Sequence, residues 1–208
     1  MIAADIVGCG SCEIYSDVCG IYTADPHLVK GARLVPEISH TCVSRMARHG
    51  AKVLHYGALE YASSRGIVIA CKSLRPQEVV GTHVAATGDV ATVIVDRSAT
   101  RLDFNDRSEW LAALRVLEEL DITWVDSGQG VGGPIYLSQD ADVALGILAE
   151  RQIKSLHISK CILVSEITSD VTRVNEFCDL SSAVSCAQKL HADLHPEERQ
   201  LASGTYNK

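Results

Sequence analysis

The chain has 208 residues, of which 47% are hydrophobic, 22% are charged and only 5% are aromatic, and its formal net charge is −7. These proportions are typical of a globular protein with an aliphatic core, and the length allows one medium domain or two small ones. The negative charge and the lack of a basic stripe argue against a nucleic-acid-binding protein, because phosphate backbones are bound by clustered Lys and Arg.

The sequence has no sign of a membrane span or a secretory signal. Its longest apolar run, Gly66–Cys71, is far shorter than the roughly 20 residues that a spanning helix needs. The N-terminus lacks a basic region followed by a long apolar one. We therefore expect a soluble, cytoplasmic protein whose eight cysteines are reduced thiols. Cys9 and Cys12 form a C-x-x-C pair that leads into a strand, which favours a tight turn over a redox pair or a zinc site.

The first part of the chain predicts helices that alternate with strands. In order, these are the end of a helix at 3–7, a strand at 12–17, helices at 35–50 and 58–66, and a buried strand at 67–73. In the helix at 35–50, Val43, Met46 and Ala47 fall on one side. Strands and helices that alternate at this spacing predict a parallel sheet covered by helices.

Residues 75–88 lose this periodicity and collect Pro, Gly and Thr, so we expect a linker there. We accordingly divide the chain into a first region at 1–80, a second region at 81–195 and a tail at 196–208.

The second region predicts a strand-rich fold. Its strands are expected at 89–96, 99–104, 122–127, 133–138, 155–159 and 161–167, and its helices at 106–121, 140–152, 169–180 and 181–194. The helix at 106–121 has Asp106 and Glu109 in capping-box spacing and Trp110, Leu114 and Leu117 on one stripe. The β-α-β-β-α-β order between Ala99 and Ser159 predicts a ferredoxin-like unit, followed by a second, abbreviated copy.

General catalytic motifs are absent from the sequence. The stretch "GQGVGG" at 128–133 matches G-x-G-x-x-G, but Pro134 and a strand follow where a dinucleotide site needs a helix N-terminus. A hairpin connection is therefore expected. There is no Walker loop, no nucleophile elbow and no histidine cluster that would bind a metal. Motifs of this kind assign no catalytic residue and no metal site.

Two stretches of the sequence are more informative about its relatives than these general motifs. "CEIYSDVCGIYTADPHLVKGARLVPEIS" at 12–39 and "GAKVLHYGALEYASSRGIVI" at 50–69 closely resemble the aspartate kinases of the amino-acid kinase family. In that family a strand ends in Thr-Asp-Val, continues to Gly-Val-Tyr-Thr-Ala-Asp-Pro-Arg and later reaches Gly-Ala-Lys-Val-Leu-His. The similarity continues through "GTHV" and "DVATVIVDRSATRLDF" toward the family's paired ACT domains. The resemblance implies an α/β (α+β) chain, with a partial nucleotide lobe on a parallel sheet followed by ferredoxin-like ACT-type domains.

The resemblance also implies an ATP site with Mg²⁺. Ser16 and Asp17 end a strand, which is where α/β sheets place ligands. Lys52 would offer its ammonium to phosphate oxygens, although a solvated lysine at a helix end is the alternative. The residues expected to border ATP are Ser16, Asp17, Tyr22, His27, Lys52 and Val53. His27 stands where the family has Arg, which removes a permanent cation.

Two phosphate-binding segments of the family have no counterpart in the sequence. These are the Lys-Phe-Gly-Gly-Thr and Gly-Gly-Ser-Asp segments. Because phosphoryl transfer depends on positioning and charge stabilisation, we expect a truncated aspartokinase-like protein that is inactive alone. It would act as a regulatory or assembly subunit that pairs with itself or with an aspartate kinase catalytic chain. Alternatively, it completes an ATP-dependent aspartate kinase, which makes 4-phospho-aspartate, together with another chain, or it is a free-standing amino-acid sensor.

The second region would bind an amino-acid effector if it is of the ACT type. The family's Asp-Arg-Pro-Gly motif reads Asp-Arg-Ser-Glu here, with Ser108 and Glu109 in place of Pro and Gly, so a standard effector pocket is not expected. Asp126, Ser127 and Gln129, after the second strand, are the remaining candidates for contact with an effector. Ordinary loop polarity is the alternative explanation for these three residues.

Overall fold

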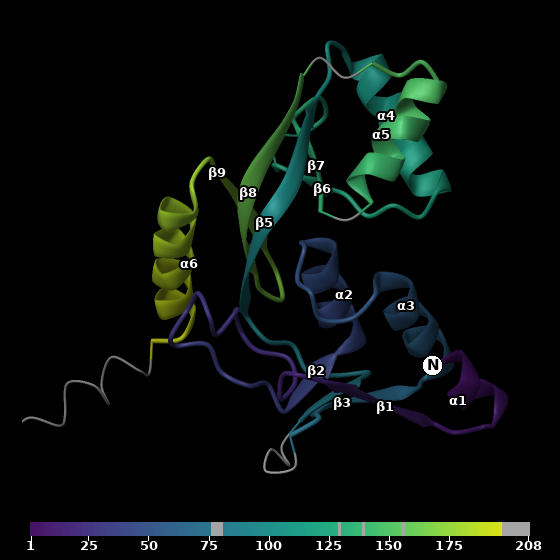
Figure 1. Cartoon of the computed structure of the whole chain (residues 1–208), viewed down its shortest axis with the longest axis vertical. Coiled ribbons are helices and arrows are strands. Elements are labelled where there is room, and N and C mark those ends of the chain that lie inside the picture. Colours follow the sequence, from purple (N-terminus) through teal and green to yellow (C-terminus); the bar gives the residue numbers. More distant parts are fainter. Residues whose placement is uncertain (76–80, 129, 139, 155–156, 197–208) are drawn as a thin grey trace, which may run out of the picture.

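The computed structural model describes residues 1–75, 81–128, 130–138, 140–154 and 157–196. It is a mixed α/β structure with two sheets, which follow one another along the chain (Figure 1). The first sheet has the order β1-β3-β4-β2. Its strands are β1 (Ser11–Ser16), β2 (Glu37–Ser39), β3 (Val68–Ser73) and β4 (Thr82–Ala85). β1 and β3 are parallel, as are β2 and β4, but β3 and β4 are antiparallel, so the sheet contains parallel pairs without being fully parallel.

Helices α1 (Ile2–Ile6), α2 (His40–Arg48) and α3 (Tyr56–Arg65) belong to this first part. α2 begins at His40, because the Ser39 hydroxyl accepts the backbone N–H of Cys42 at 3.0 Å and caps the helix. α3 ends at Gly66, which has a φ of 64° in the left-handed region. Val43, Met46 and Ala47 are buried, as their shared side predicted.

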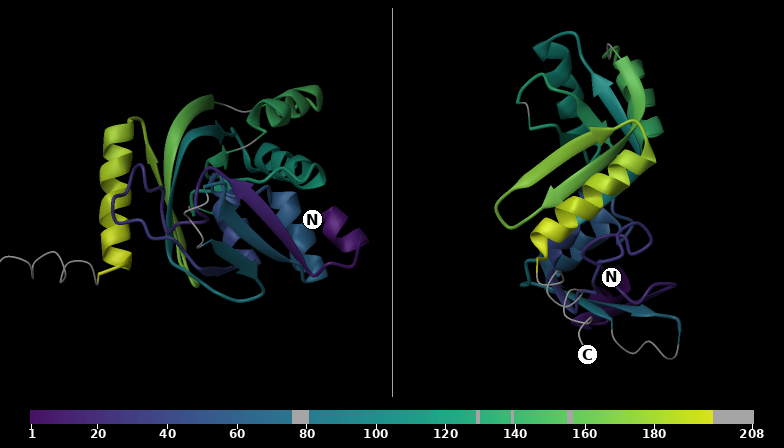
Figure 2. Two further views of the ribbon diagram at one scale, coloured as in Figure 1. Left: turned by 60° about the horizontal axis from the view of Figure 1, so that its bottom comes forward. Right: turned by 90° about the vertical axis from the view of Figure 1, so that its left-hand side faces the viewer.

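The second sheet is antiparallel and has the order β6-β7-β5-β8-β9. Its strands are β5 (Thr92–Asp103), β6 (Val125–Asp126), β7 (Ile135–Leu137), β8 (His157–Ile167) and β9 (Thr172–Phe177). Helices α4 (Arg107–Glu119) and α5 (Ala141–Glu150) lie together at one end of the long strands, and α6 (Leu180–Leu194) lies beside the other end (Figures 1 and 2). Trp110, Leu114 and Leu117 are buried in the core under α4 and α5, as predicted.

Several expected elements were wrong in type or extent. Residues 37–39 form strand β2 and not the start of a helix, and residues 82–85, expected in a linker, form β4. The helix expected at 169–180 is largely strand β9, which pairs with β8 over six residues. Where two strands were predicted within 89–104, the single long strand β5 is found, and where two were predicted within 155–167, the described residues 157–167 form the single strand β8. β5 absorbs an irregularity between Asp96 and Ala99.

The two parts of the chain share packing and hydrogen bonds. Ile94 of β5 and Ile167 of β8 are buried in the same cluster as the side chains of α2. Arg45 of α2 donates to the Thr168 carbonyl and the Thr172 hydroxyl, both at 2.7 Å, which joins the helix to the β8–β9 hairpin. α2 is therefore held by both parts at once.

Among the described residues, no helix has both the length and the apolar character that crossing a membrane requires. Of the tail predicted at 196–208, all but Pro196 lies outside the described residues.

Candidate functional site

The first candidate site begins where β1 ends and the chain turns. Gly20 has a φ of 153°, and a Cβ built on it would lie 2.5 Å from the Thr82 hydroxyl oxygen. That hydroxyl accepts the backbone N–H of Ile21 at 2.8 Å and donates to the Val35 carbonyl at 2.6 Å. The glycine therefore lets the backbone approach β4 closely enough to be fixed there, and it sets the direction of the segment that follows.

The loop at residues 23–27 is held from two sides. The Thr23 hydroxyl accepts the backbone N–H of Arg33 at 2.9 Å and forms a 2.9 Å hydrogen bond with the ring of His191 on α6. The Asp25 carboxylate accepts the backbone N–H of His27 at 2.8 Å, a local turn that places the His27 side chain at the surface. The second half of the chain thus helps to shape this loop.

The turn after α2 completes the site. Gly50 has a φ of 89° and packs against the buried side chain of Asp96, so that an added Cβ would lie 2.6 Å from the Asp96 carboxyl carbon. The chain then continues directly to Ala51, Lys52 and Val53. This contact between α2 and β5 fixes where the Lys52 backbone lies.

Four of the six residues expected to border ATP line one cavity of about 200 Å³: Tyr22, His27, Lys52 and Val53. Ser16 and Asp17 do not line it, although Val18 does, and the Ser16 hydroxyl instead donates to the Val18 carbonyl at 3.0 Å. The cavity is completed by residues that sequence reasoning missed, chiefly Met46 of α2 and 93–95 of β5. The latter lie on a strand of the other sheet, and no local sequence pattern connects them with Lys52.

The chemistry of this cavity is simple. Apolar side chains form most of its walls, and Lys52 is the one Lys or Arg among its lining residues. Asp25 is the one carboxylate there, and no group of three His, Cys, Asp or Glu side chains that could hold a metal occurs within the described residues. The cavity can hold a flat apolar group and offer a single ammonium to an anion. A magnesium ion would have to be held mainly by the ligand's own phosphates.

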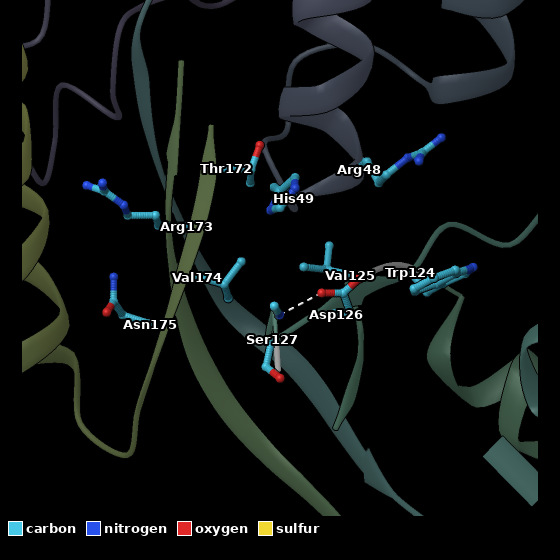
Figure 3. Close-up of a pocket in the computed structure, with 11 residues that line it drawn as sticks. Arg48, His49, Trp124, Val125, Asp126, Ser127, Thr172, Arg173, Val174 and Asn175 are labelled. Atoms are coloured by element: carbon cyan, nitrogen blue, oxygen red, sulfur yellow. Dashed lines mark hydrogen bonds between the residues drawn. The ribbon is translucent and has the colours of Figure 1, made fainter. Parts of the chain in front are cut away.

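A second, larger cavity of about 610 Å³ lies between α2, the end of β6 and β9 (Figure 3). Asp126 and Ser127, expected as effector contacts, line it, whereas Gln129 lies outside the described residues. The Asp126 carboxylate accepts the backbone N–H of Gly128 at 2.6 Å. Sequence reasoning missed the contribution of α2, which adds Arg48 and His49, and of β9, which adds residues 172–175.

His49 is the buried polar group of this second cavity. Its Nδ1 forms a 2.9 Å hydrogen bond with the Ser165 hydroxyl of β8. Burial lowers the pKa of the ring to about 4, and the nearby positive charges of Arg45 and Arg48 act in the same direction. The imidazole is therefore neutral at pH 7 and acts as a packed, hydrogen-bonded part of the wall.

Two other sequence features are the glycine-rich stretch at 128–133 and the cysteines. The "GQGVGG" stretch connects the antiparallel strands β6 and β7, as predicted. All eight cysteines are free thiols. Burial raises the pKa of Cys71 to about 11 and that of Cys161 to about 12, which makes these two thiols poor nucleophiles at pH 7.

Sequence comparison places the first third of the chain among known proteins. Residues 1–73 match the model of the amino acid kinase family. The aspartokinase of Thermus thermophilus is 43% identical over 70 residues, which are 34% of this chain and 17% of that protein. The aspartokinase of Mycobacterium tuberculosis is 40% identical over 80 residues, or 37% of this chain and 19% of that one. The aligned parts thus span less than a fifth of these curated relatives.

The fold comparison extends over most of the chain. E. coli aspartokinase III in complex with aspartate and ADP superposes with a TM-score of 0.63 at 24% identity, covering 81% of this chain and 42% of that one. The same enzyme in complex with lysine and aspartate gives a TM-score of 0.63 at 21% identity, covering 92% and 53%. The resemblance to the aspartate kinases is confirmed, by sequence for the first third of the chain and by fold for most of the rest.

Proposed function

We propose that this aspartokinase-like chain is a regulatory or assembly subunit of amino-acid biosynthesis that binds ATP around Lys52 and transfers no phosphoryl group alone. The observation that carries the proposal is that Tyr22, His27, Lys52 and Val53 line a single cavity, although they come from two separate motifs. A solved aspartokinase of similar fold is described in complex with ADP, which supports a nucleotide as the ligand.

The lining residues have complementary roles in this proposal. The apolar wall formed by Met46, Val53 and β5 suits the base or ribose of a nucleotide, and the Lys52 ammonium suits a phosphate oxygen. Asp25, an exposed residue of the cavity lining, is the available carboxylate for a magnesium ion that arrives with the phosphates. When bound, Mg²⁺ would neutralise phosphate charge.

The size of the cavity argues against independent catalysis. Its volume of about 200 Å³ is below the roughly 300–1,000 Å³ usual for sites that enclose a whole small-molecule ligand. Part of an ATP molecule would therefore remain outside the cavity, and the Lys52 ammonium would be the one lysine or arginine charge of the lining near its phosphates. Phosphoryl transfer needs positive charge around the transferred group and an attacking oxygen placed in line with the leaving oxygen. Lys52 supplies positive charge on only one side of that group.

A second candidate function is that the chain completes an aspartate kinase together with another polypeptide. β1 favours this candidate, because it stands at the end of its sheet and, among the described residues, pairs with β3 alone. Tyr15, Val18 and Leu74, at and beyond the ends of these two strands, are exposed apolar residues, with exposed fractions of 52%, 41% and 69%. An open strand edge beside apolar side chains is a surface on which a further strand can pair.

We also propose that the second region is of the ACT type. In support, β5-α4-β6-β7-α5-β8 has the β-α-β-β-α-β order, and its strands lie in the order β6-β7-β5-β8. ACT-type domains pair and bind amino acids, so a homodimer and an amino-acid effector belong to this proposal, as does the alternative of a free-standing sensor. The boundary near residue 80 shifts toward residue 88 in this view, because β4 completes the first sheet.

An activity assay tests the non-catalytic role. The purified chain is incubated with Mg-ATP and aspartate, alone and mixed with an active aspartate kinase chain, and the acyl phosphate is trapped with hydroxylamine. We expect no product from the chain alone and a changed rate in the mixture. Acyl phosphate made by the chain alone, and lost in Lys52→Ala, would overturn the proposal. Product that appears only on mixing with an inactive catalytic chain would favour the second candidate.

A further inference from the structure

Cys9 and Cys12 flank the turn that leads from α1 into β1. Cys12 belongs to β1, whereas Cys9 precedes the strand, and the chain bends at Gly10 between them. Cys9 is exposed, and Cys12 is half-buried with its side chain packed against the core cluster of the first part of the chain. Two cysteines in C-x-x-C spacing are the common form of a redox-active dithiol. The tight turn that the sequence favours is therefore compatible with a redox pair.

The Cys9 sulfur lies close to the backbone of Cys12. Its Sγ is 3.2 Å from the Ser11 carbonyl oxygen, which belongs to the peptide bond that joins Ser11 to Cys12. Because a carbonyl oxygen and the next Cα are about 3 Å apart, the Cys9 Sγ is at most roughly 6 Å from the Cys12 Cα. The Cys12 thiol makes a long contact of 3.9 Å with the Glu13 carbonyl, which holds it weakly. A small movement of the turn brings the two sulfurs to the bonding distance of about 2 Å.

Glycines on both sides of Cys9 allow this movement. Gly8 has a φ of 69°, and no atom of the described residues lies within 4 Å of a Cβ built on Gly8 or on Gly10. The backbone of the turn can therefore rearrange without meeting packed neighbours. Cys71, on the neighbouring strand β3, is buried, and its pKa of about 11 removes it as a competing nucleophile.

Cys9 is the thiol that reacts first. Its hydrogen bonds with the backbone and the hydroxyl of Ser11 lower the pKa of the Cys9 thiol below its ordinary value. The thiolate is the attacking form in disulfide exchange, and an exposed sulfur is accessible to a molecule in solution. Cys9 thus meets an external disulfide, and Cys12 is placed to resolve the product.

We propose that Cys9 and Cys12 form a reversible disulfide by exchange with a low-molecular-weight disulfide. The Cys9 thiolate attacks one sulfur of that molecule, forms a mixed disulfide and releases one thiolate. Cys12 then loses its proton to solvent, attacks the Cys9 sulfur and releases the second thiolate. The two cysteines lose two electrons and two protons, and the small disulfide is reduced to two thiols. In a reducing compartment such a bond forms transiently, as redox-sensing disulfides do.

The new bond acts on the end of α1. The backbone N–H of Cys9 donates to the Ala4 carbonyl at 2.8 Å and so satisfies one of the last carbonyls of the helix. α1 lies beside α3 (Figure 1), where the Asp5 carboxylate accepts the Tyr61 hydroxyl at 2.5 Å. A helix of five residues has little stability of its own. Movement of Cys9 toward Cys12 therefore loosens the end of α1.

Glutathione redox buffers test the disulfide. The reduced chain is equilibrated with mixtures of reduced and oxidised glutathione and quenched with acid, and its free thiols are alkylated and located by mass spectrometry. We expect the wild type to lose alkylation at Cys9 and Cys12 together, with no glutathione bound at either, and a reductant to restore both. Cys12→Ser should instead retain glutathione on Cys9. Cys178→Ser, which removes the other exposed thiol, should form the internal disulfide like the wild type.

Two results would overturn the proposal. One is a wild type in which Cys9 and Cys12 both stay free in the most oxidising buffer. The other is a wild type that retains glutathione on Cys9 to the same extent as Cys12→Ser, since Cys12 then resolves nothing.

Amide hydrogen exchange tests the effect on α1. We expect the amides of residues 7–9 to exchange faster in the disulfide-bonded chain than in the reduced chain, and those of α6 to exchange equally in both. Equal exchange at residues 7–9 in a chain shown to be disulfide-bonded would refute the loosening of α1 while the disulfide itself stands.

Discussion

Replacement of Gly50 by alanine is predicted to be severely destabilising. The residue has a φ of 89°, and a Cβ there would lie 2.6 Å from the carboxyl carbon and 2.7 Å from the Cβ of the buried Asp96. A left-handed alanine costs about 1–2 kcal/mol, and forcing atoms into a packed interior costs about 1–3 kcal/mol more. We expect Gly50→Ala to lower the free energy of unfolding by about 2–5 kcal/mol, measured by urea denaturation.

Gly66 supplies the matched control for this prediction. It also has a left-handed φ, of 64°, but nothing lies within 4 Å of an added Cβ. Gly66→Ala should therefore cost only the backbone contribution of about 1–2 kcal/mol. The difference between the two variants measures the contact between Gly50 and Asp96.

A double-mutant cycle isolates the contact further. Asp96→Ala removes the carboxylate that the new Cβ would meet but keeps the Asp96 Cβ, so it should offset part of the cost of Gly50→Ala, with an interaction free energy of about 1 kcal/mol or more. Equal effects of Gly50→Ala and Gly66→Ala, or strictly additive effects of Gly50→Ala and Asp96→Ala, would refute the reasoning that this contact fixes the Lys52 turn.

Two further predictions concern His49 and Asp106. Burial keeps the folded-state pKa of His49 at about 4, below the 6.5 of an unfolded histidine, so the unfolded state takes up the proton first and the folded state loses stability as the pH falls from about 6.5 to about 4. This loss amounts to roughly 3 kcal/mol, and urea denaturation of wild type and His49→Gln at both ends of the window should show it only in the wild type. Asp106 caps α4 by accepting the backbone N–H groups of Ser108 and Glu109 at 2.7 and 3.0 Å, so Asp106→Ala should lower the urea denaturation midpoint, and an unchanged midpoint would contradict the cap.

Local signals explain which elements were predictable from the sequence. α4 was predicted because its cap at Asp106 and its stripe of Trp110 and Leu114 lie within one turn or two of each other. β9 was missed because it is stabilised by pairing with β8, and only the alternation of Val174 with polar neighbours indicates a strand. The short strands β2 and β4 depend on each other in the same way, since neither has a hydrophobic pattern of its own.

The candidate sites likewise combine residues that local motifs predict with residues that distant segments contribute. Tyr22, His27, Lys52 and Val53 were proposed as ATP contacts because family motifs carry them, whereas the β5 wall of the cavity that they line comes from a distant strand. Asp126 was predicted as an effector contact from its position after a strand, but Arg48 lines the same cavity only because α2 packs beside β6 and β9. Contacts between regions depend on tertiary packing, which a single sequence does not show.

Calorimetric titration of the chain with Mg-ATP tests the central claim most directly. Wild type should bind, and Lys52→Ala should bind about tenfold more weakly or worse, since a charge-assisted hydrogen bond to phosphate contributes about 1.4 kcal/mol or more. Lys30→Ala, which removes an exposed lysine outside the cavity, should bind like the wild type. Equal ATP affinity in wild type and Lys52→Ala, or no heat from wild type at millimolar ATP, would contradict a nucleotide site around Lys52.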